Sequence, residues 1–239
     1  MINCTSDGTC LIATVKDLCY LAVCVNKGDD CAGKTFKLVD DIDLTGVDFT
    51  PIGNDENNFN GTFDGDGHTI SNLRINSSGD GAGLFGYVSK GGTIKNVNLS
   101  NVNISGNDYV GGLIGFNSGS VSNCAISGTV NGSKNVGGLV GWNCCGFVEN
   151  STANTTVSGN EDVGGLVGDN GGKIKNSTAN ATVSGNEDVG GLVGFNCEMI
   201  ENCTVNATVS GNDIVGGIVG LILGVIKNCT SNTRVSIKN

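Results

Sequence analysis

The sequence predicts an all-β fold, a parallel β-solenoid, from three markers that recur with one period. The tract Val-Gly-Gly-(Leu/Ile)-(Ile/Val)-Gly begins at Val110, Val136, Val163, Val189 and Val215. An asparagine recurs with the same step, at Asn72, Asn96, Asn123, Asn150, Asn176, Asn202 and Asn228. A glycine does so at Gly106, Gly132, Gly159, Gly185 and Gly211. Markers in phase indicate a repeat protein, in which each repeat buries its apolar face by stacking on its neighbours.

Each repeat is predicted to form one rung, that is, one turn of the solenoid. It contains three short runs bounded by Gly or Asn, with no ten-residue stretch of helical spacing. In residues 151–157 and their copies, small or apolar residues alternate with polar ones, which is the period of a half-buried strand. We therefore expect three short strands per ~26-residue rung. Seven or eight rungs spaced by about 4.8 Å would form a rod about 35–40 Å long.

The recurring asparagines predict columns of stacked amides. At a fixed corner of stacked rungs, each side chain can hydrogen-bond the one above and the one below, so that no amide is buried without a partner. We expect the set from Asn72 to Asn228 to form one such column. A second column is expected at Asn117, Asn143, Asn170 and Asn196.

The chain divides into an N-terminal cap, residues 1–33, and a solenoid, residues 34–239. Thr14 and Asp17 have the spacing of a helix N-cap and its acidic partner, and apolar residues follow at helical spacing, which predicts an amphipathic helix over 14–27. No comparable cap follows the last repeat, and we expect the full-length protein to continue beyond residue 239. Residues 221–223 (Leu-Ile-Leu) replace a polar corner, so this edge is a surface through which the chain could associate.

Composition excludes several classes of partner. The 239 residues include 13 basic and 23 acidic side chains, for a net charge of −10, which argues against nucleic acid. No run approaches the roughly 20 apolar residues that a membrane-spanning helix needs, and no targeting signal is visible. We expect no membrane insertion in this segment.

A leader segment and the repeats together resemble a known family. Residues 36–38 (Phe-Lys-Leu), 41–44 (Asp-Ile-Asp-Leu), 51–53 (Pro-Ile-Gly) and 59–70 (Phe-Asn-Gly-Thr-Phe-Asp-Gly-Asp-Gly-His-Thr-Ile) precede the Val-Gly-Gly tracts. In this order they closely resemble the GLUG-motif repeat proteins, which are adhesin-like proteins of bacterial and archaeal surfaces. The resemblance implies a right-handed parallel β-helix, a cell-surface or extracellular location and a binding or spacer role. It brings no known active site.

The cysteines allow two interpretations of one inward column. Cys203 and Cys229 align with Cys124, Ser151 and Ser177, at one strand spacing from each other, so they could form a disulfide. The alternative is a stack of small buried thiols. Five further cysteines lie in the cap, where disulfides are expected if the protein is exported.

An acidic corner is the candidate cation site. Carboxylates that recur after the repeated glycine would be brought together by stacking and could recruit Ca²⁺; the residues are Glu161, Asp162, Glu187, Asp188 and Asp213. The alternative is a solvated acidic edge. No other cofactor is expected.

We expect a non-catalytic adhesin or stalk module that presents one face to a glycan or to a host or surface protein. The candidate binding face consists of outward Thr and Asn columns: Thr152, Asn154, Thr156, Thr178, Asn180, Thr182, Thr204, Asn206, Thr208, Thr230 and Asn232. The same columns suggest an alternative, an ice-binding protein. A second alternative is a carbohydrate-active enzyme, for which Asp40, Asp41, Asp43, Asp64 and Asp66 are the carboxylates available. His68, the sole histidine, has no catalytic context.

Overall fold

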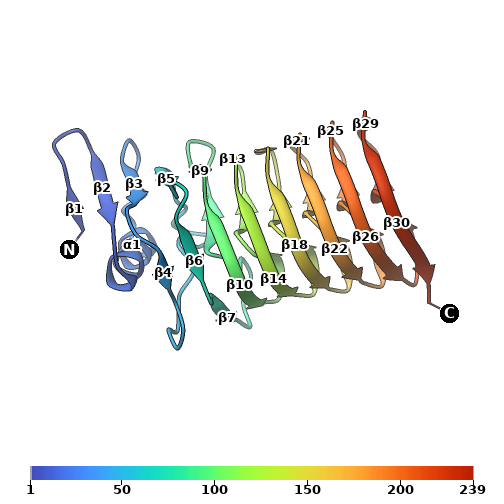
Figure 1. Cartoon of the computed structure of the whole chain (residues 1–239), viewed down its shortest axis with the longest axis horizontal. Helices are drawn as coiled ribbons and strands as arrows, with labels where there is room; N and C mark the ends of the chain where they lie inside the picture. The colour runs from blue at the N-terminus through green and yellow to red at the C-terminus, as the bar shows by residue number, and fades with distance from the viewer. Residues whose placement is uncertain (1, 239) are drawn as a thin grey trace.

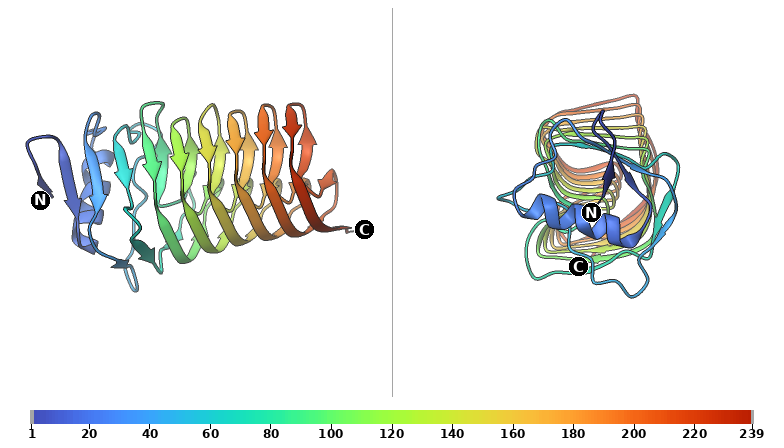
Figure 2. Two further views of the ribbon diagram at one scale, coloured as in Figure 1. Left: turned by 45° about the horizontal axis from the view of Figure 1, so that its top comes forward. Right: turned by 90° about the vertical axis from the view of Figure 1, so that its left-hand side faces the viewer.

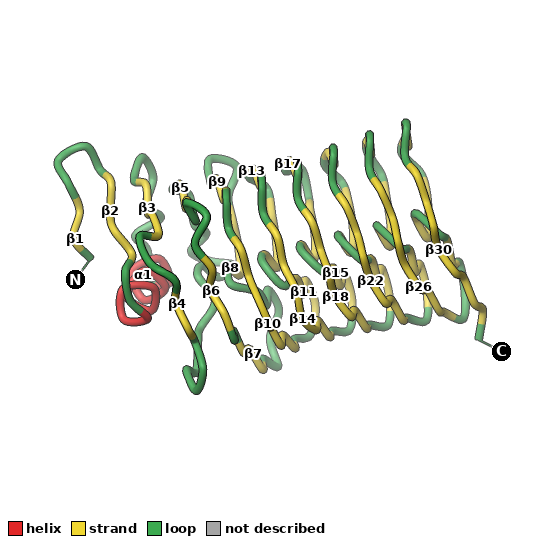
Figure 3. The backbone as a smooth tube through the Cα atoms, viewed as in Figure 1, coloured by secondary structure: helices red, strands yellow, loops and turns green. Residues whose placement is uncertain are grey.

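Short strands stack into a rod with the two chain ends at opposite ends of the long axis (Figure 1). The structure is a computed structural model that describes residues 2–238. All pairs between strands are parallel except for β1 with β2, which is antiparallel. Strands dominate each rung, and the one helix of the described residues lies at the N-terminal end (Figure 3). The predicted parallel β-solenoid is confirmed.

Four sheets run along the rod, and we number them in the order in which the chain visits them within a rung. Sheet 1 contains β1 (Asn3–Cys4), β2 (Thr9–Ile12), β3 (Thr35–Leu38), β5 (Thr62–Asp64), β9 (Thr93–Lys95), β13 (Ser120–Ser122), β17 (Phe147–Glu149), β21 (Lys173–Lys175), β25 (Met199–Glu201) and β29 (Val225–Lys227). Sheet 2 contains β4 (Ile42–Asp43), β6 (Thr69–Ser71), β7 (Arg74–Asn76), β10 (Asn98–Ser105), β14 (Ala125–Asn131), β18 (Thr152–Ser158), β22 (Thr178–Ser184), β26 (Thr204–Gly211) and β30 (Thr230–Ile237).

The Val-Gly-Gly tract contributes to two further sheets. Sheet 3 contains β11 (Asp108–Gly111), β15 (Lys134–Gly137), β19 (Glu161–Gly164), β23 (Glu187–Gly190) and β27 (Val215–Gly216). Sheet 4 contains β8 (Phe85–Val88), β12 (Ile114–Asn117), β16 (Val140–Asn143), β20 (Val167–Asn170), β24 (Val193–Asn196) and β28 (Val219–Ile222). The expectation of three strands per rung is therefore wrong. The tract bends at its second glycine and the leucine, for example at Gly165 and Leu166, and this bend divides one expected strand into two.

The number of rungs also exceeds the expected seven or eight. Nine strands of sheet 1, from β2 to β29, pair in parallel. The additional rung arises because β2 lies inside the N-terminal cap, and it pairs with β3 through Thr9 opposite Thr35 and Ile12 opposite Leu38. The cap is thus joined to the solenoid by a continuous sheet.

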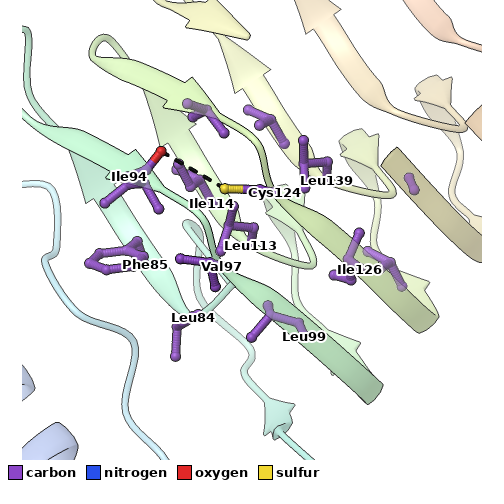
Figure 4. Close-up of a cluster of buried hydrophobic side chains, with 14 of the residues drawn as sticks. Leu84, Phe85, Ile94, Val97, Leu99, Leu113, Ile114, Cys124, Ile126 and Leu139 are labelled. Carbon is purple, nitrogen blue, oxygen red and sulfur yellow. Dashed lines mark hydrogen bonds between the residues drawn. The ribbon is translucent and has the colours of Figure 1, made fainter. Parts of the chain in front are cut away.

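The core follows from the alternation seen in the sequence. In β18, Ala153, Thr155 and Val157 are buried, whereas Asn154 and Thr156 are exposed. Figure 4 shows the apolar side chains of successive rungs packed inside the rod, with Cys124 Sγ 3.8 Å from the carbonyl oxygen of Ile94. Each rung places its apolar residues against those of the next, so the core is continuous along the axis.

The predicted cap helix is confirmed as α1 (Val15–Asn26), which lies across the end of the solenoid in the end-on view (Figure 2). Asp17 N–H donates to Thr14 Oγ1 over 3.2 Å, and the Asp17 carboxylate accepts from Thr14 N–H over 3.0 Å, which completes a capping box. Leu18, Leu21, Ala22 and Val25 are buried, as expected. The helix is also tied to the body, because Asn26 Oδ1 accepts from Gly53 N–H over 2.8 Å.

The first asparagine set has a different role from the one expected. All seven residues have φ between 49° and 60°, which is the left-handed region that asparagine tolerates better than other side chains. From Asn96 to Asn228 they form the turn between sheet 1 and sheet 2, whereas Asn72 lies between β6 and β7 of sheet 2 and accepts from the amide of Asn101. Most are exposed, and amide contacts within the set are long, as in Asn123 Nδ2 to Asn96 Oδ1 at 3.3 Å. Backbone geometry, rather than a buried ladder, explains their recurrence.

The second set is the buried amide ladder. Asn117, Asn143, Asn170 and Asn196 are each fully buried. The Nδ2 atom of each of the first three donates to the Oδ1 of the next asparagine, over 2.8, 2.8 and 2.7 Å in turn. Each Nδ2 also donates to a carbonyl of its own corner, such as Gly172 O at 2.9 Å from Asn170. The ladder ends where Ile222 replaces asparagine. This prediction is confirmed.

The inward cysteine column is held by hydrogen bonds instead of a disulfide. Cys203 and Cys229 are both free, and Cys203 N–H donates to Cys229 Sγ over 3.4 Å. Serine makes the same contact in the same column, since Ser151 N–H donates to Ser177 Oγ over 3.2 Å. In this column a small side chain accepts a hydrogen bond from one backbone N–H and donates one to a backbone carbonyl. The thiols are engaged in these bonds, so the disulfide alternative is wrong. A disulfide does join Cys4 and Cys10 in the cap.

Candidate binding face

A column of aromatic side chains occupies the outward position of sheet 4. The register aligns, in successive rungs, Tyr87, Phe116, Trp142, Asp169, Phe195 and Leu221. All six side chains are partly exposed, in contrast to the inward residues of the same strands, such as Phe85 and Ile114, which are fully buried. The aromatic residues of this column therefore lie on the outside of the rod.

The neighbouring column of sheet 3 lies beside it. Its members precede the repeated valine and have φ between 47° and 55°; they are Tyr109, Asn135, Asp162, Asp188 and Ile214. The ring centroids of Tyr109 and Trp142 are 5.2 Å apart, and those of Phe116 and Trp142 are 5.0 Å apart. Tyr87 stacks on Phe116 at 5.5 Å. We call the two columns together the aromatic–acidic face.

Glycines in sheet 4 allow the two columns to lie side by side. The residue before each outward position of sheet 4 is a glycine that packs on the backbone of sheet 3. A Cβ added at Gly141 would lie 2.5 Å from Val110 N, and one added at Gly168 would lie 2.5 Å from the carbonyl carbon of Asn135. No side-chain layer can separate the strands at this distance. As a result, the outward residues of both sheets form one surface.

Two carboxyl groups at the centre of the aromatic–acidic face have raised pKa values. Burial, together with the charge of Asp169, raises the pKa of Asp162 to about 7. Burial likewise raises the pKa of Asp169 to about 6, although Lys134 and a hydrogen bond from Asn135 act in the opposite direction. Asn135 Nδ2 donates to Asp169 Oδ2 over 3.2 Å. Lys134 Nζ pairs with Glu161 and lies 3.8 Å from Asp162 Oδ2.

The Asp162→Asn variant should be more stable than the parent at pH 8, by about 1–2 kcal/mol. In the folded state the pKa of Asp162 is about 7, whereas its ordinary value is 3.8, so folding keeps this carboxyl protonated to a higher pH. Ionisation of this carboxyl therefore removes stability as the pH rises from about 4 to 7, and asparagine cannot ionise. Urea denaturation at pH 8 and pH 3.5 measures the effect, since the gain should vanish at the lower pH. An equal gain at both values would contradict the prediction.

The outward Thr and Asn residues of sheet 2 form the predicted columns. Thr152, Thr178, Thr204 and Thr230 pair in register, as do the asparagine column and the second threonine column. Asn180 Nδ2 donates to Asn154 Oδ1 over 2.8 Å, and Asn206 Nδ2 donates to Asn180 Oδ1 over 2.9 Å. Arg234 replaces threonine in the last rung. This face presents hydroxyl and amide groups on a regular grid.

The acidic residues proposed for calcium are not one exposed cluster. Asp162 and Asp188 are 6% and 8% exposed, whereas Glu187 and Asp213 are exposed at the surface. Among residues 2–238, no group of three or more His, Cys, Asp and Glu side chains is arranged to hold a metal ion. Calcium binding stays a prediction, and it would be contradicted if calcium changed neither the melting temperature nor the heat of mixing.

The carboxylates considered for glycoside hydrolysis have structural partners. The Thr69 N–H holds the pKa of Asp41 below its ordinary value, and the Asn72 side chain does the same for Asp43. Asp64 pairs with Lys95, and Asp66 pairs with Lys37. His68 Nδ1 lies 3.3 Å from Asp41 Oδ1. A general acid requires a raised pKa, so Asp41 and Asp43 are unsuited to that role.

Sequence reasoning missed the aromatic–acidic face, although a signal for it was present. Gly-Tyr87, Gly-Phe116, Gly-Trp142 and Gly-Phe195 follow the period of the repeat. A rung of three strands assigns these residues to a corner. The four-strand rung places them on a sheet, facing outward.

Comparisons with known proteins agree with the repeat and the fold. The model of the GLUG motif matches residues 106–131, 159–184 and 185–210. The chain carries repeats of the GLUG motif. This GLUG-repeat chain is 36% identical over 142 residues to halomucin of Haloquadratum walsbyi, and 36% identical over 104 residues to a candidate Gly-rich membrane protein of Evansella cellulosilytica.

The aligned segments are small parts of both relatives. They cover 55% of the GLUG-repeat chain and 2% of halomucin, and 39% of the chain and 12% of the membrane protein. A crystal structure of a candidate immunoglobulin A1 protease from Bacteroides ovatus superposes with a TM-score of 0.77, over 98% of this chain and 79% of that one. At 24% sequence identity, this superposition shows a shared fold. The chain is thus a GLUG-repeat β-solenoid module.

Proposed function

We propose that this chain is a non-catalytic binding module of a cell-surface protein, which presents the aromatic–acidic face to a glycan or to a host or surface protein. The observation that carries the proposal is the outward aromatic column, in which Tyr87, Phe116 and Trp142 lie in successive rungs. Partly exposed aromatic side chains give a binding surface large contact area at low entropic cost. They lie outside the core, because Phe116 and Trp142 are partly exposed whereas Ile114 and Val140 of the same strands are fully buried.

The relatives support a rod displayed at the cell surface. The relatives include a protein named halomucin and another named as a membrane protein, and both are much longer than this chain. None of the helices within residues 2–238 is long and apolar enough to cross a membrane. We infer an extracellular module in which the solenoid acts both as a spacer and as a scaffold for the face.

The test is binding of labelled protein to a panel of glycans, mucins and host-cell surfaces. Trp142→Ala should weaken saturable binding about tenfold, as expected for loss of a central aromatic contact. Tyr20→Ala, on α1, is the matched control and should leave binding unchanged, because this exposed aromatic side chain lies outside both the aromatic–acidic face and the Thr and Asn columns. No saturable binding, or a loss in the control but not in Trp142→Ala, would contradict the proposal.

The register of sheet 2 favours one second candidate, an ice-binding protein. Three Thr and Asn columns align rung by rung, with the asparagine amides bonded to one another. Such a grid can order surface water. Thermal hysteresis and shaping of ice crystals are the measurements, and Thr182→Tyr in the middle of the grid should abolish both. Their absence in the parent protein would remove this candidate.

A further inference from the structure

We propose that the centre of the aromatic–acidic face, formed by Tyr109, Asn135, Trp142, Asp162 and Asp169, binds an arginine side chain of a basic protein segment. This inference rests on the proposed function and names the class of partner. The hydrogen-bonding capacity, the charge and the aromatic surface of the site all favour this ligand.

The unmet hydrogen-bonding capacity at the site belongs to acceptors. Asn135 is 3% exposed and Asp188 is 8% exposed, and the Oδ1 atom of each has no hydrogen-bond partner among the described residues. The Asn135 side chain lies in the site, because its Nδ2 donates to Asp169 Oδ2 over 3.2 Å. A buried acceptor without a partner is costly. A ligand that brings several N–H donors would therefore satisfy more of this site than one that also brings acceptors, as a sugar hydroxyl does.

Charge favours a cationic ligand. Asp162 experiences the charges of three other carboxyl groups, Asp169, Glu161 and Asp188, and of one ammonium group, Lys134, which lies 3.8 Å from its Oδ2. Lys134 is engaged by Glu161 and Asp162, and neither Asp169 nor Asp188 has an ion-pair partner in residues 2–238. Asp169 is partly exposed and can be reached from solvent. A second cation at Asp169 would offset the repulsion between Asp162 and Asp169.

The aromatic side chains favour guanidinium over ammonium. Trp142 is paired in register with Asp169 of the next rung, and the Tyr109 ring lies 5.2 Å from that of Trp142. A guanidinium group can stack on such a ring while its N–H groups point at a carboxylate. The ammonium of lysine lacks this planar geometry. The site thus matches one arginine, and the remaining aromatic column can contact the rest of the partner segment.

The probe is a fluorescent nine-residue peptide of alternating Arg and Gly, titrated with the full chain at pH 7.5 and low ionic strength. Asp169→Asn should weaken binding about tenfold or more, because it removes the charge and keeps the shape. Trp142→Ala should weaken it about fivefold to tenfold. Glu56→Gln, an exposed acid in the loop between β4 and β5, removes the same charge elsewhere and should have little effect. A lysine peptide should bind more weakly than the arginine peptide.

The outcomes separate this inference from the proposed function. Equal losses in Asp169→Asn and Glu56→Gln would show non-specific attraction to an acidic protein and would overturn the inference. Binding of a neutral glycan that is lost in Trp142→Ala but kept in Asp169→Asn and in 0.5 M salt would also overturn it, and the proposed function would stand. Absence of binding to the peptide and to the whole panel would overturn both. Circular dichroism of each variant verifies that it is folded.

Discussion

The substitution Gly191→Ala should lower the free energy of unfolding by about 3 kcal/mol or more. A Cβ at this position would lie 2.3 Å from the carbonyl oxygen of Gly217 and 2.8 Å from Val205 Cγ1. The first of these contacts is with the backbone of the next rung, which cannot move without breaking the sheet. The rungs on both sides of the bend would be forced apart.

The repeat supplies a matched control for this variant. Gly217 occupies the same position one rung later, where a Cβ would meet nothing closer than Ser231 Oγ at 3.4 Å. Gly217→Ala should therefore change stability by less than about 0.5 kcal/mol. Urea denaturation of the 239-residue chain, followed by circular dichroism, measures both. Equal effects at the two positions would show that the close backbone approach is not the reason for glycine.

Asn143→Leu should cost about 3 kcal/mol or more, because leucine keeps the branched shape of asparagine but makes none of its hydrogen bonds. Asn143 is fully buried in the amide ladder and accepts from Asn117 while donating to Asn170. Leucine would leave the amide of Asn117 and the oxygen of Asn170 without these partners. Each buried orphan costs about 1–3 kcal/mol.

An exposed asparagine is the control for the ladder. Asn154 also bonds to its neighbour in the next rung, at 2.8 Å from Asn180 Nδ2, but water can replace that partner. Asn154→Ala should change the free energy of unfolding by less than about 0.5 kcal/mol. If Asn143→Leu were as mild as Asn154→Ala, the ladder would be a by-product of stacking and not a source of stability.

Much of the fold could be predicted because the same residue pattern recurs in every repeat of the sequence. Alternation in residues 151–157 identified the inward and outward sides of sheet 2, and the step of the tract identified the rungs. The helix was predictable because its signals are local, from the Thr14 and Asp17 cap to the buried Leu18 and Leu21.

What could not be predicted depends on contacts between rungs. The bend at Gly165 and Leu166 has no local turn signature that distinguishes it from a strand rich in glycine, so the fourth strand was missed. The cysteine pair at 203 and 229 had a compatible spacing, but only the structure shows that both side chains bond to the backbone.

The candidate site was harder to predict than the fold. Asp162 and Asp169 are seven positions apart and belong to different sheets, and the sequence places one in an acidic corner and the other inside a valine-rich tract. Their proximity arises from the glycines that bring sheets 3 and 4 together, such as Gly168 on Asn135. The distances between side chains across that bend follow from the three-dimensional path, which the repeat period alone does not specify.

The reach of this protein can change only in discrete steps. Residues 156–168 and 182–194 are identical in sequence, and one rung stacks on the next through the same columns in both copies. Unequal recombination between such copies would add or remove whole rungs while every column stays continuous. Each event would move whatever is attached to the rod by about 4.8 Å and leave the aromatic side chains nearer the N-terminus untouched. Length and recognition can therefore evolve separately in the same domain.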